Sequence, residues 1–178
     1  MSKKVLVAYG TRYGSARIVA GDIAEYLGNK GAQVEVVDLK EGRPSAGLGD
    51  YDLVVVGSGV AMFSLVGSVK RFLRKCRKSG AKTAVFITCG TSIEDVGKAR
   101  EKFLDKVLGR IGLDPVLSQP VNPVIDFRPG QGLPDRLKGR IKGTVKAMAK
   151  DGFREDGLMD LRDKRRFGEF LENLGELI

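Results

Sequence analysis

The chain has no histidine among its 178 residues and only two cysteines, Cys76 and Cys89. Without histidine it cannot carry Ser-His-Asp or Cys-His catalysis, a histidine general base or a histidine-ligated metal. Two thiols far apart in the sequence argue further against a zinc or iron–sulfur site. We therefore predict no catalytic side chain and no metal, and expect any chemistry to come from a bound cofactor.

Long hydrophobic runs are also missing. No apolar run approaches the ~20 residues that a membrane span needs, and the first strand candidate is not preceded by the hydrophobic region of a signal peptide. Two cysteines in a chain of this size do not indicate a disulfide framework. These observations predict a cytoplasmic protein with reduced thiols, with peripheral attachment to a membrane as the alternative.

Positive charge is abundant, with a formal net charge of +9. The segment Lys70–Lys82 carries seven basic residues and no acidic one, and Asp135–Lys150 carries six basic residues and one acidic one. Each run is either a solvated helix face or a docking surface for an acidic protein or an anionic membrane. Nucleic acid fits least well, because no DNA- or RNA-binding motif accompanies the charge.

Apolar side chains in Asp135–Lys150 leave two interpretations open. Leu137, Ile141, Val145 and Met148 recur at helical spacing among the basic residues. Such a helix can lie on an anionic membrane surface or pack on the protein's own sheet.

Short apolar strand candidates alternate with amphipathic helix patterns. The strands are Val5–Ala8, Val34–Leu39, Leu53–Val56, Ala84–Thr88 and part of Val116–Phe127. Pro120 and Pro123 interrupt the fifth candidate, which predicts a strand at an edge or one split by a loop.

The helices are indicated by apolar residues three and four apart. Their apolar positions are Ala16, Val19, Ile23 and Leu27; Val66, Val69, Phe72 and Leu73; Val96, Ala99, Phe103 and Val107; and Phe167, Phe170, Leu171, Leu174 and Ile178.

This alternation predicts an α/β fold, a doubly wound five-stranded parallel sheet of order 2-1-3-4-5 with helices on both faces. We expect one domain over residues 1–178, with a basic helical insertion or extension at about 134–157 before the terminal helix. In this order, ligands bind beyond the carboxyl ends of strands one and three.

Three polar loops should meet there, GTRYGSA (Gly10–Ala16), GSGVAMF (Gly57–Phe63) and TCGTS (Thr88–Ser92). Gly14 permits a tight turn, and the free amides at the start of the following helix favour an anion. No P-loop lysine follows, so a phosphate monoester fits better than a nucleoside triphosphate with magnesium. The alternative is that Ser15 is only an N-cap and Gly14 only a turn residue.

The segment VLVAYGTRYGSARIVAGDIAEYL resembles the phosphate-binding segment of flavodoxins, whose loop reads roughly S/T-x-T-G-x-T. Its YGS form, the segment YDLVVVGSGVAMFSLVGSVKRFLRK and the tail DGLMDLRDKRRFGEFLENL are similar to the flavodoxin-type branch that includes menaquinone-dependent protoporphyrinogen oxidase. The resemblance implies a flavodoxin-like fold and an FMN cofactor, and it spans nearly the whole chain.

By position, the resemblance implies three groups of cofactor contacts. Thr11, Arg12, Tyr13, Gly14, Ser15 and Ala16 would hold the FMN phosphate. Ser58, Gly59, Val60, Ala61, Met62 and Phe63 would line one side of the isoalloxazine ring. Cys89, Gly90, Thr91 and Ser92 would approach its other side or the ribityl chain. Cys89 is otherwise expected to be an ordinary small buried residue.

The chain departs from the flavodoxin pattern at several points. Ala16 replaces a threonine that usually gives the phosphate a hydroxyl, and the fourth strand's loop lacks the aromatic residue that often stacks on the ring. Flavodoxins are also commonly acidic, whereas this chain is basic.

We predict an FMN-dependent oxidoreductase or electron-transfer flavoprotein that carries electrons to an acidic redox partner protein. The first alternative is an oxidase of the menaquinone-dependent protoporphyrinogen type, acting at an anionic membrane surface with a quinone. The second is a flavin-free interaction module with the same fold. A receiver domain is disfavoured, because AYGTR and VVGSG stand where it needs an acidic cluster.

Overall fold

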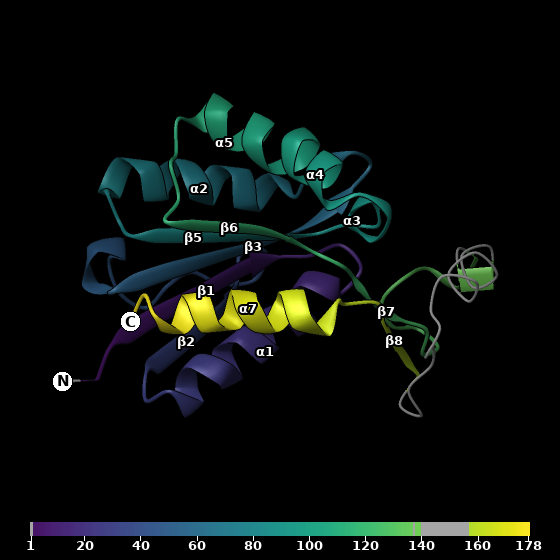
Figure 1. Ribbon diagram of the computed structural model, residues 1–178, viewed down its shortest axis with the longest axis horizontal. Helices are drawn as coiled ribbons and strands as arrows, with labels where there is room; N and C mark the ends of the chain where they lie inside the picture. The colour runs from purple at the N-terminus through teal and green to yellow at the C-terminus, as the bar shows by residue number, and fades with distance from the viewer. Residues whose placement is uncertain (1, 137, 140–156) are drawn as a thin grey trace.

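The computed structural model describes residues 2–136, 138–139 and 157–178 (Figure 1). Its main sheet has five parallel strands, and β1 lies second in the sheet. The order is β2 (Gln33–Asp38), β1 (Lys4–Gly10), β3 (Leu53–Ala61), β5 (Thr83–Thr88) and β6 (Leu117–Val121). Counting only the parallel strands, this is order 2-1-3-4-5, and the predicted doubly wound α/β fold is confirmed.

Two helical layers cover the sheet (Figure 1). One layer contains α1 (Ser15–Asn29) and α7 (Lys164–Gly175). The other contains α2 (Gly67–Ser79) and a continuous helical run made of α4 (Val96–Ala99), η2 (Arg100–Asp105) and α5 (Lys106–Ile111). A short helix, α3 (Thr91–Glu94), precedes this run.

The α1 side of the core follows the predicted helical spacing. Val19, Ile23 and Leu27 are fully buried, and they pack with Val5, Val7 and other residues of the sheet. Burial of each such side chain contributes about 1.5–3 kcal/mol relative to leaving it in water. The helix runs to Asn29, two residues beyond the last predicted apolar position, Leu27.

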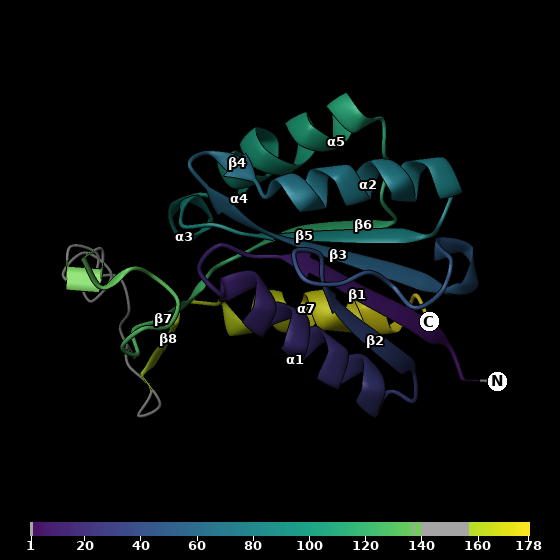
Figure 2. The ribbon, with the colours of Figure 1, turned by 180° about the vertical axis from the view of Figure 1, so that it is seen from behind.

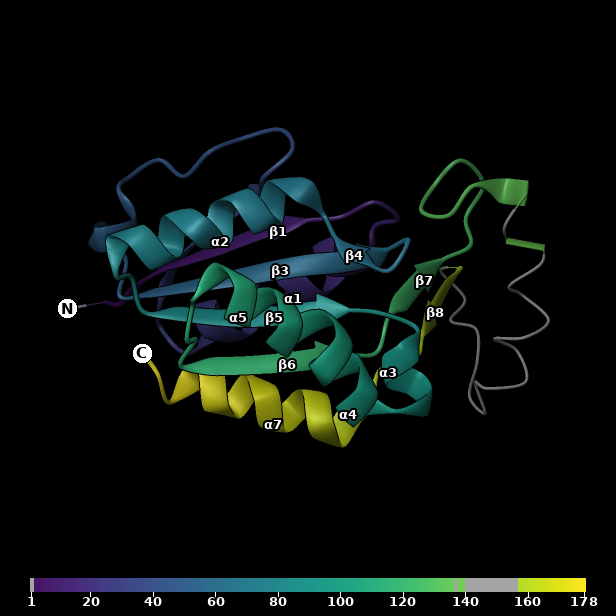
Figure 3. The ribbon, with the colours of Figure 1, turned by 90° about the horizontal axis from the view of Figure 1, so that it is seen from above.

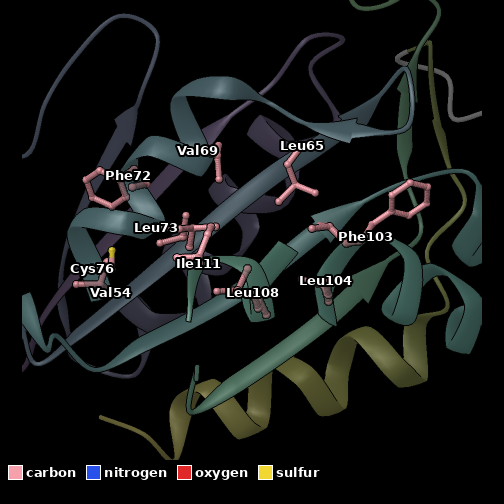
Figure 4. Close-up of a cluster of buried hydrophobic side chains, with 14 of the residues drawn as sticks. Val54, Leu65, Val69, Phe72, Leu73, Cys76, Phe103, Leu104, Leu108 and Ile111 are labelled. Atoms are coloured by element: carbon pink, nitrogen blue, oxygen red, sulfur yellow. The ribbon is translucent and has the colours of Figure 1, made fainter. Parts of the chain in front are cut away.

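The α2–α5 side of the core departs from the predicted spacing because η2 is π-helical. A π turn adds one residue, so the buried face shifts by one position along the chain. Phe103 and Leu104 are therefore both buried, and Leu108 and Ile111 continue the buried face in place of the predicted Val107 (Figure 4).

The proline-interrupted segment is both at an edge and split, as the sequence predicts. Pro120 lies in β6, an edge strand that pairs with β5 and with no other strand among the described residues, so it needs no hydrogen-bond donors on its outer side. After Pro123 the chain forms β7 (Val124–Asp126), which leaves the sheet and pairs with β8 (Leu158–Asp160). Figures 1 and 2 show this hairpin beyond the end of the sheet.

Arg162 joins this hairpin to α1. Its guanidinium donates to Asp160, with Nη2 2.6 Å from Oδ2, and to Asp22 on α1. Asp163 then begins α7 by accepting a hydrogen bond from the Arg166 backbone N–H at 3.0 Å. The chain after β8 is thus fixed to α1 before it returns along the sheet.

The basic helical insertion predicted at about 134–157 lies mostly outside the described residues, as does most of Asp135–Lys150. No helix in the described ranges is long and apolar enough to cross a membrane.

Candidate functional site

A crevice of about 400 Å³ opens where β1, β3 and β5 end. Figure 3 shows β4 (Ser64–Leu65), α3 and the β7–β8 hairpin gathered at this end of the sheet. Its volume falls within the roughly 300–1,000 Å³ typical of small-molecule sites. The predicted ligand position beyond the strand ends therefore coincides with a real cavity.

The start of α1 forms one wall. Gly14 precedes the helix at φ +87°, a left-handed conformation that favours glycine. Its N–H donates to Thr11 Oγ1 at 2.9 Å, which closes the turn. The next three N–H groups, from Ser15 to Arg17, have no carbonyl within the helix to bind. Together with the positive end of the helix dipole they favour an anion.

Ser15 is not the N-cap of α1, because Gly14 occupies that position. Instead the Ser15 hydroxyl oxygen accepts a hydrogen bond from the Val124 backbone N–H at 3.1 Å. A hydroxyl that accepts in this way keeps its own proton free to donate. Ser15 thus joins the loop after β1 to β7 and retains a donor for a ligand.

Thr88, at the end of β5, is 3% exposed and lines the crevice. Its Oγ1 atom has no hydrogen-bond partner among the described residues. A buried hydroxyl without a partner carries a desolvation cost of about 1–3 kcal/mol. A polar ligand group in the crevice would remove that cost.

Cys89 is 4% exposed and also lines the crevice. Burial raises its pKa above the ordinary thiol value, and burial raises the pKa of Cys76 to about 11. Both cysteines are free thiols. The prediction that Cys89 is buried is confirmed, and the raised pKa disfavours the reactive thiolate form.

The crevice has both polar and apolar lining residues. Arg12 and Glu94 are the two charged residues that line it. The apolar wall is formed by Val60, Ala61, Ile93, Pro123, Val124, Ile125 and Leu133. This combination suits a molecule with an anionic end and a flat apolar body.

Nine of the sixteen residues predicted as cofactor contacts line the crevice. They are Thr11, Arg12, Tyr13, Ser15, Gly59, Val60, Ala61, Cys89 and Gly90. The other seven, Gly14, Ala16, Ser58, Met62, Phe63, Thr91 and Ser92, do not line it.

Some of these seven have other roles. Ala16 is fully buried in the core under α1. Ser58 Oγ accepts from the Val66 N–H at 3.1 Å and donates to the Gly59 carbonyl. Met62 and Phe63 are both 79% exposed at the tip of the β3–β4 hairpin.

Seven lining residues were not among the predicted cofactor contacts, although Thr88 belongs to the loop Thr88–Ser92 that was predicted to reach the crevice. They are Thr88, Ile93, Glu94, Pro123, Val124, Ile125 and Leu133. Four of them belong to the β7 region, which reaches the crevice only because the chain leaves the sheet after Pro123. The two prolines were a signal of that break, but the spacing of residues could not show where the chain goes next.

A family model described as a flavodoxin domain matches residues 6–115. Among curated proteins, no relative matches the chain. Flavodoxin 1 from Bacillus cereus superposes with a TM-score of 0.51 at 20% identity, over 83% of this chain and 98% of that one.

Two further structures resemble the chain. A flavoprotein in complex with FMN from Lactobacillus acidophilus gives a TM-score of 0.51 at 17% identity, over 67% of this chain and 93% of that one. A rubredoxin:oxygen oxidoreductase from Desulfovibrio gigas gives 0.49 at 19% identity, over 82% of this chain. This chain spans only 36% of that protein's length.

Proposed function

This chain belongs to the flavodoxin domain family, and we propose that it binds FMN in the crevice and carries electrons between redox partner proteins. The family match covers residues 6–115, which include the loops after β1, β3 and β5. FMN supplies the redox chemistry, because its isoalloxazine ring takes up and releases electrons. The protein's residues bind the cofactor, orient it and cover it.

The observation that carries the proposal is the polar wall of the crevice at the start of α1. Ser15 lines the crevice, and its hydroxyl keeps a proton free to donate. The N–H groups of Ser15, Ala16 and Arg17, at the start of α1 beside it, have no acceptor within the helix and would supply further donors for a phosphate dianion. No lysine is needed for a monophosphate held in this way. Ala16 contributes through its backbone, since its side chain is in the core.

The remaining walls suit the ring and the ribityl chain. Val60 and Ala61 from β3, Ile93 from α3 and Ile125 from β7 line the crevice and offer apolar contact for a flat ring. The unpartnered Thr88 hydroxyl offers a hydrogen bond to a ribityl hydroxyl or a ring heteroatom. The residues present therefore fit FMN.

Electron carriage is favoured over an oxidase because no described residue of the crevice has to act as a general acid or base. The resemblance to menaquinone-dependent protoporphyrinogen oxidase finds no support among the matched proteins.

The test is to purify the full chain, record its absorption spectrum and identify the released small molecule by mass spectrometry. We expect flavin bands and FMN, with riboflavin binding at least about 10-fold more weakly to the apoprotein because it lacks the phosphate. A chain that stays colourless with micromolar FMN would refute the proposal and leave a flavin-free module with this fold.

A matched pair of variants isolates the phosphate loop. Gly14 and Gly31 have φ of +87° and +91°, and an added Cβ meets nothing within 4 Å at either. Gly14→Ala and Gly31→Ala should therefore cost a similar ~1 kcal/mol of backbone strain. Only Gly14→Ala should weaken FMN binding.

A further inference from the structure

The tip of the β3–β4 hairpin consists of two large apolar residues in an unfavourable backbone conformation. Ala61 pairs with Ser64, so Met62 and Phe63 form a two-residue loop, with φ of 50° and 61°. Positive φ at both loop residues is the pattern of a type I′ turn, which favours Asn-Gly, Asp-Gly or Gly-Gly. Such strain is concentrated at functional sites.

Neither side chain at the tip is explained by packing within the chain. Met62 and Phe63 are each 79% exposed, and they are the most exposed large hydrophobic residues among those described. Strain and exposure together disfavour this tip in the isolated protein. Another molecule that covers it would recover the hydrophobic contribution.

A groove of about 410 Å³ lies beside this tip, between the hairpin, α2 and the η2–α5 run. Its apolar lining includes Val107 together with Leu65, Phe103 and Ile111, which also belong to the core cluster of Figure 4. Its charged lining is entirely positive and consists of Lys70, Arg74, Lys102, Lys106 and Arg110. We call these five residues the basic groove.

No carboxylate neutralises the basic groove in the part of the chain that the structure describes, since none of its five cations forms an ion pair there. Lys70 Nζ donates to Ser64 Oγ at 3.0 Å. Lys102 Nζ lies 4.7 Å from the centroid of the Phe63 ring, within the range of a cation–π interaction. That contact places a charge of the basic groove directly beside the exposed tip.

The same hairpin also borders the crevice. Val60 and Ala61 line the crevice, whereas Phe63, Ser64 and Leu65 line the basic groove. The Arg12 guanidinium, from the loop after β1, donates to Met62 Sδ at 3.3 Å. A molecule bound to the tip and the basic groove would thus lie next to the crevice. Electron transfer needs two redox centres close together, and this position would provide that.

We propose that Met62, Phe63 and the basic groove form a docking surface for an acidic redox partner protein. This inference rests on the proposed function and adds the location and chemistry of the partner's site. Apolar anchors beside charged groups are the usual composition of a protein interface, and complementary charge steers the encounter. A free anion would leave Met62 and Phe63 in water, so a protein surface fits better.

Two double variants of equal charge test the proposal on the full chain. Lys102→Glu/Lys106→Glu changes the basic groove. Arg71→Glu/Lys75→Glu makes the same change in charge at the same spacing on α2, at a separate cavity. All four side chains are exposed, so both variants should fold.

The probe is an acidic [2Fe–2S] ferredoxin, with binding measured by calorimetry at low ionic strength. We expect the Lys102→Glu/Lys106→Glu variant to lose at least about 10-fold in affinity and the control about 3-fold or less, with both effects shrinking as salt is added. No binding to the unmodified protein, or an equal loss in the two variants, would overturn the proposal. If the Lys102→Glu/Lys106→Glu variant no longer floats with phosphatidylserine vesicles but still binds ferredoxin, the basic groove binds a membrane instead and the proposal is overturned.

A second variant, Met62→Asn/Phe63→Gly, gives the turn the residues that its conformation prefers. We expect a higher melting temperature and at least about 5-fold weaker ferredoxin binding, since the anchors are gone. Higher stability with unchanged binding would show that the tip has no docking role.

Calorimetry on apoprotein and on FMN-treated protein separates the two proposals. Binding that depends on the basic groove in a protein that takes up no FMN would leave the docking surface standing and refute the proposed function. An FMN-loaded protein that does not bind ferredoxin through the basic groove would leave the proposed function standing and refute the docking surface.

Discussion

The Ser15 hydroxyl oxygen accepts a hydrogen bond from the Val124 backbone N–H at 3.1 Å, across 109 positions of sequence. This contact fastens the β7 strand to the loop that begins α1. Val124 is 1% exposed, so its N–H has no access to water as an alternative. One side chain therefore shapes the crevice and supplies a donor within it.

Replacing Ser15 with alanine should weaken FMN binding about 10- to 100-fold, because a hydrogen bond to a charged group contributes about 1.5–3 kcal/mol. It should also lower the free energy of unfolding by about 1 kcal/mol, since the Val124 N–H loses its partner. Quenching of flavin fluorescence measures the first effect and urea denaturation the second. Ser79→Ala, at the far end of α2, is the control and should leave FMN affinity unchanged.

The Thr88→Val variant should separate ligand binding from stability. Valine has the same shape but no hydroxyl, and the Thr88 hydroxyl has no partner among the described residues. The apoprotein should therefore be equally stable or up to about 1 kcal/mol more stable, while FMN binds about 5- to 10-fold more weakly. Thermal melts of apoprotein and flavin titrations check the two effects. Unchanged FMN affinity would show that no ligand group meets this hydroxyl.

The Gly57→Ala variant should destabilise the protein by about 3 kcal/mol. A Cβ at this position would lie 2.1 Å from Cζ of the fully buried Phe86, and the ring has no free space to enter. Gly21→Ala is the matched control, because Gly21 is exposed on α1 with nothing within 4 Å of the added atom. The free energy of unfolding of the Gly21→Ala variant should rise by about 0.5–1 kcal/mol, because alanine has a higher helix propensity than glycine. Urea denaturation measures both, and equal stabilities would contradict the packing at Gly57.

Stability should fall in acid partly through Glu35. Hydrogen bonds from Ser45 and from the Tyr51 hydroxyl, which lies 2.6 Å from Oε2, hold the pKa of the Glu35 carboxyl below its ordinary value. A group with a lowered folded-state pKa stabilises the protein above its unfolded-state pKa, and this stabilisation is lost as the pH falls through the folded-state pKa. Glu35→Gln should lower the free energy of unfolding by up to about 1 kcal/mol at pH 7, because solvent screens this partly exposed carboxylate, and by less below about pH 4.

Denaturation of both proteins across pH 3 to 7 measures this difference. Glu172→Gln, at an exposed position of α7, is the control. Its free energy of unfolding should differ little from that of the unmodified protein at either pH 3 or pH 7. A constant difference between Glu35→Gln and the unmodified protein across the range would contradict the role of the Glu35 charge.

The two thiols should react slowly in the folded protein. Burial raises the pKa of Cys76 to about 11, so its thiolate fraction at pH 8 falls roughly 100-fold below that of an ordinary thiol. Alkylation by iodoacetamide, followed by mass spectrometry, should be far slower in the native chain than in urea. Adding FMN should slow Cys89 further, because Cys89 lines the crevice. Rapid alkylation of native Cys76 would contradict its burial.

The sequence by itself determined the sheet and its helical layers. Apolar residues in continuous short runs form strands that are covered on both faces, and the spacing of Val19, Ile23 and Leu27 forms a helix on one face. Because both patterns depend on neighbouring residues in the chain, they can be read without a structure. The parallel order then located the crevice at the carboxyl ends of the strands.

Only the tertiary structure decided which residues from outside the three predicted loops join the crevice, and which predicted contacts do not line it. The π turn in η2 moved the buried face from Val107 to Leu108, and the chain after Pro123 left the sheet to bring Val124 against Ser15. The β3–β4 hairpin turned Met62 and Phe63 away from the crevice into water. Each outcome depends on packing between segments far apart in sequence, and local patterns carry no information about such distances.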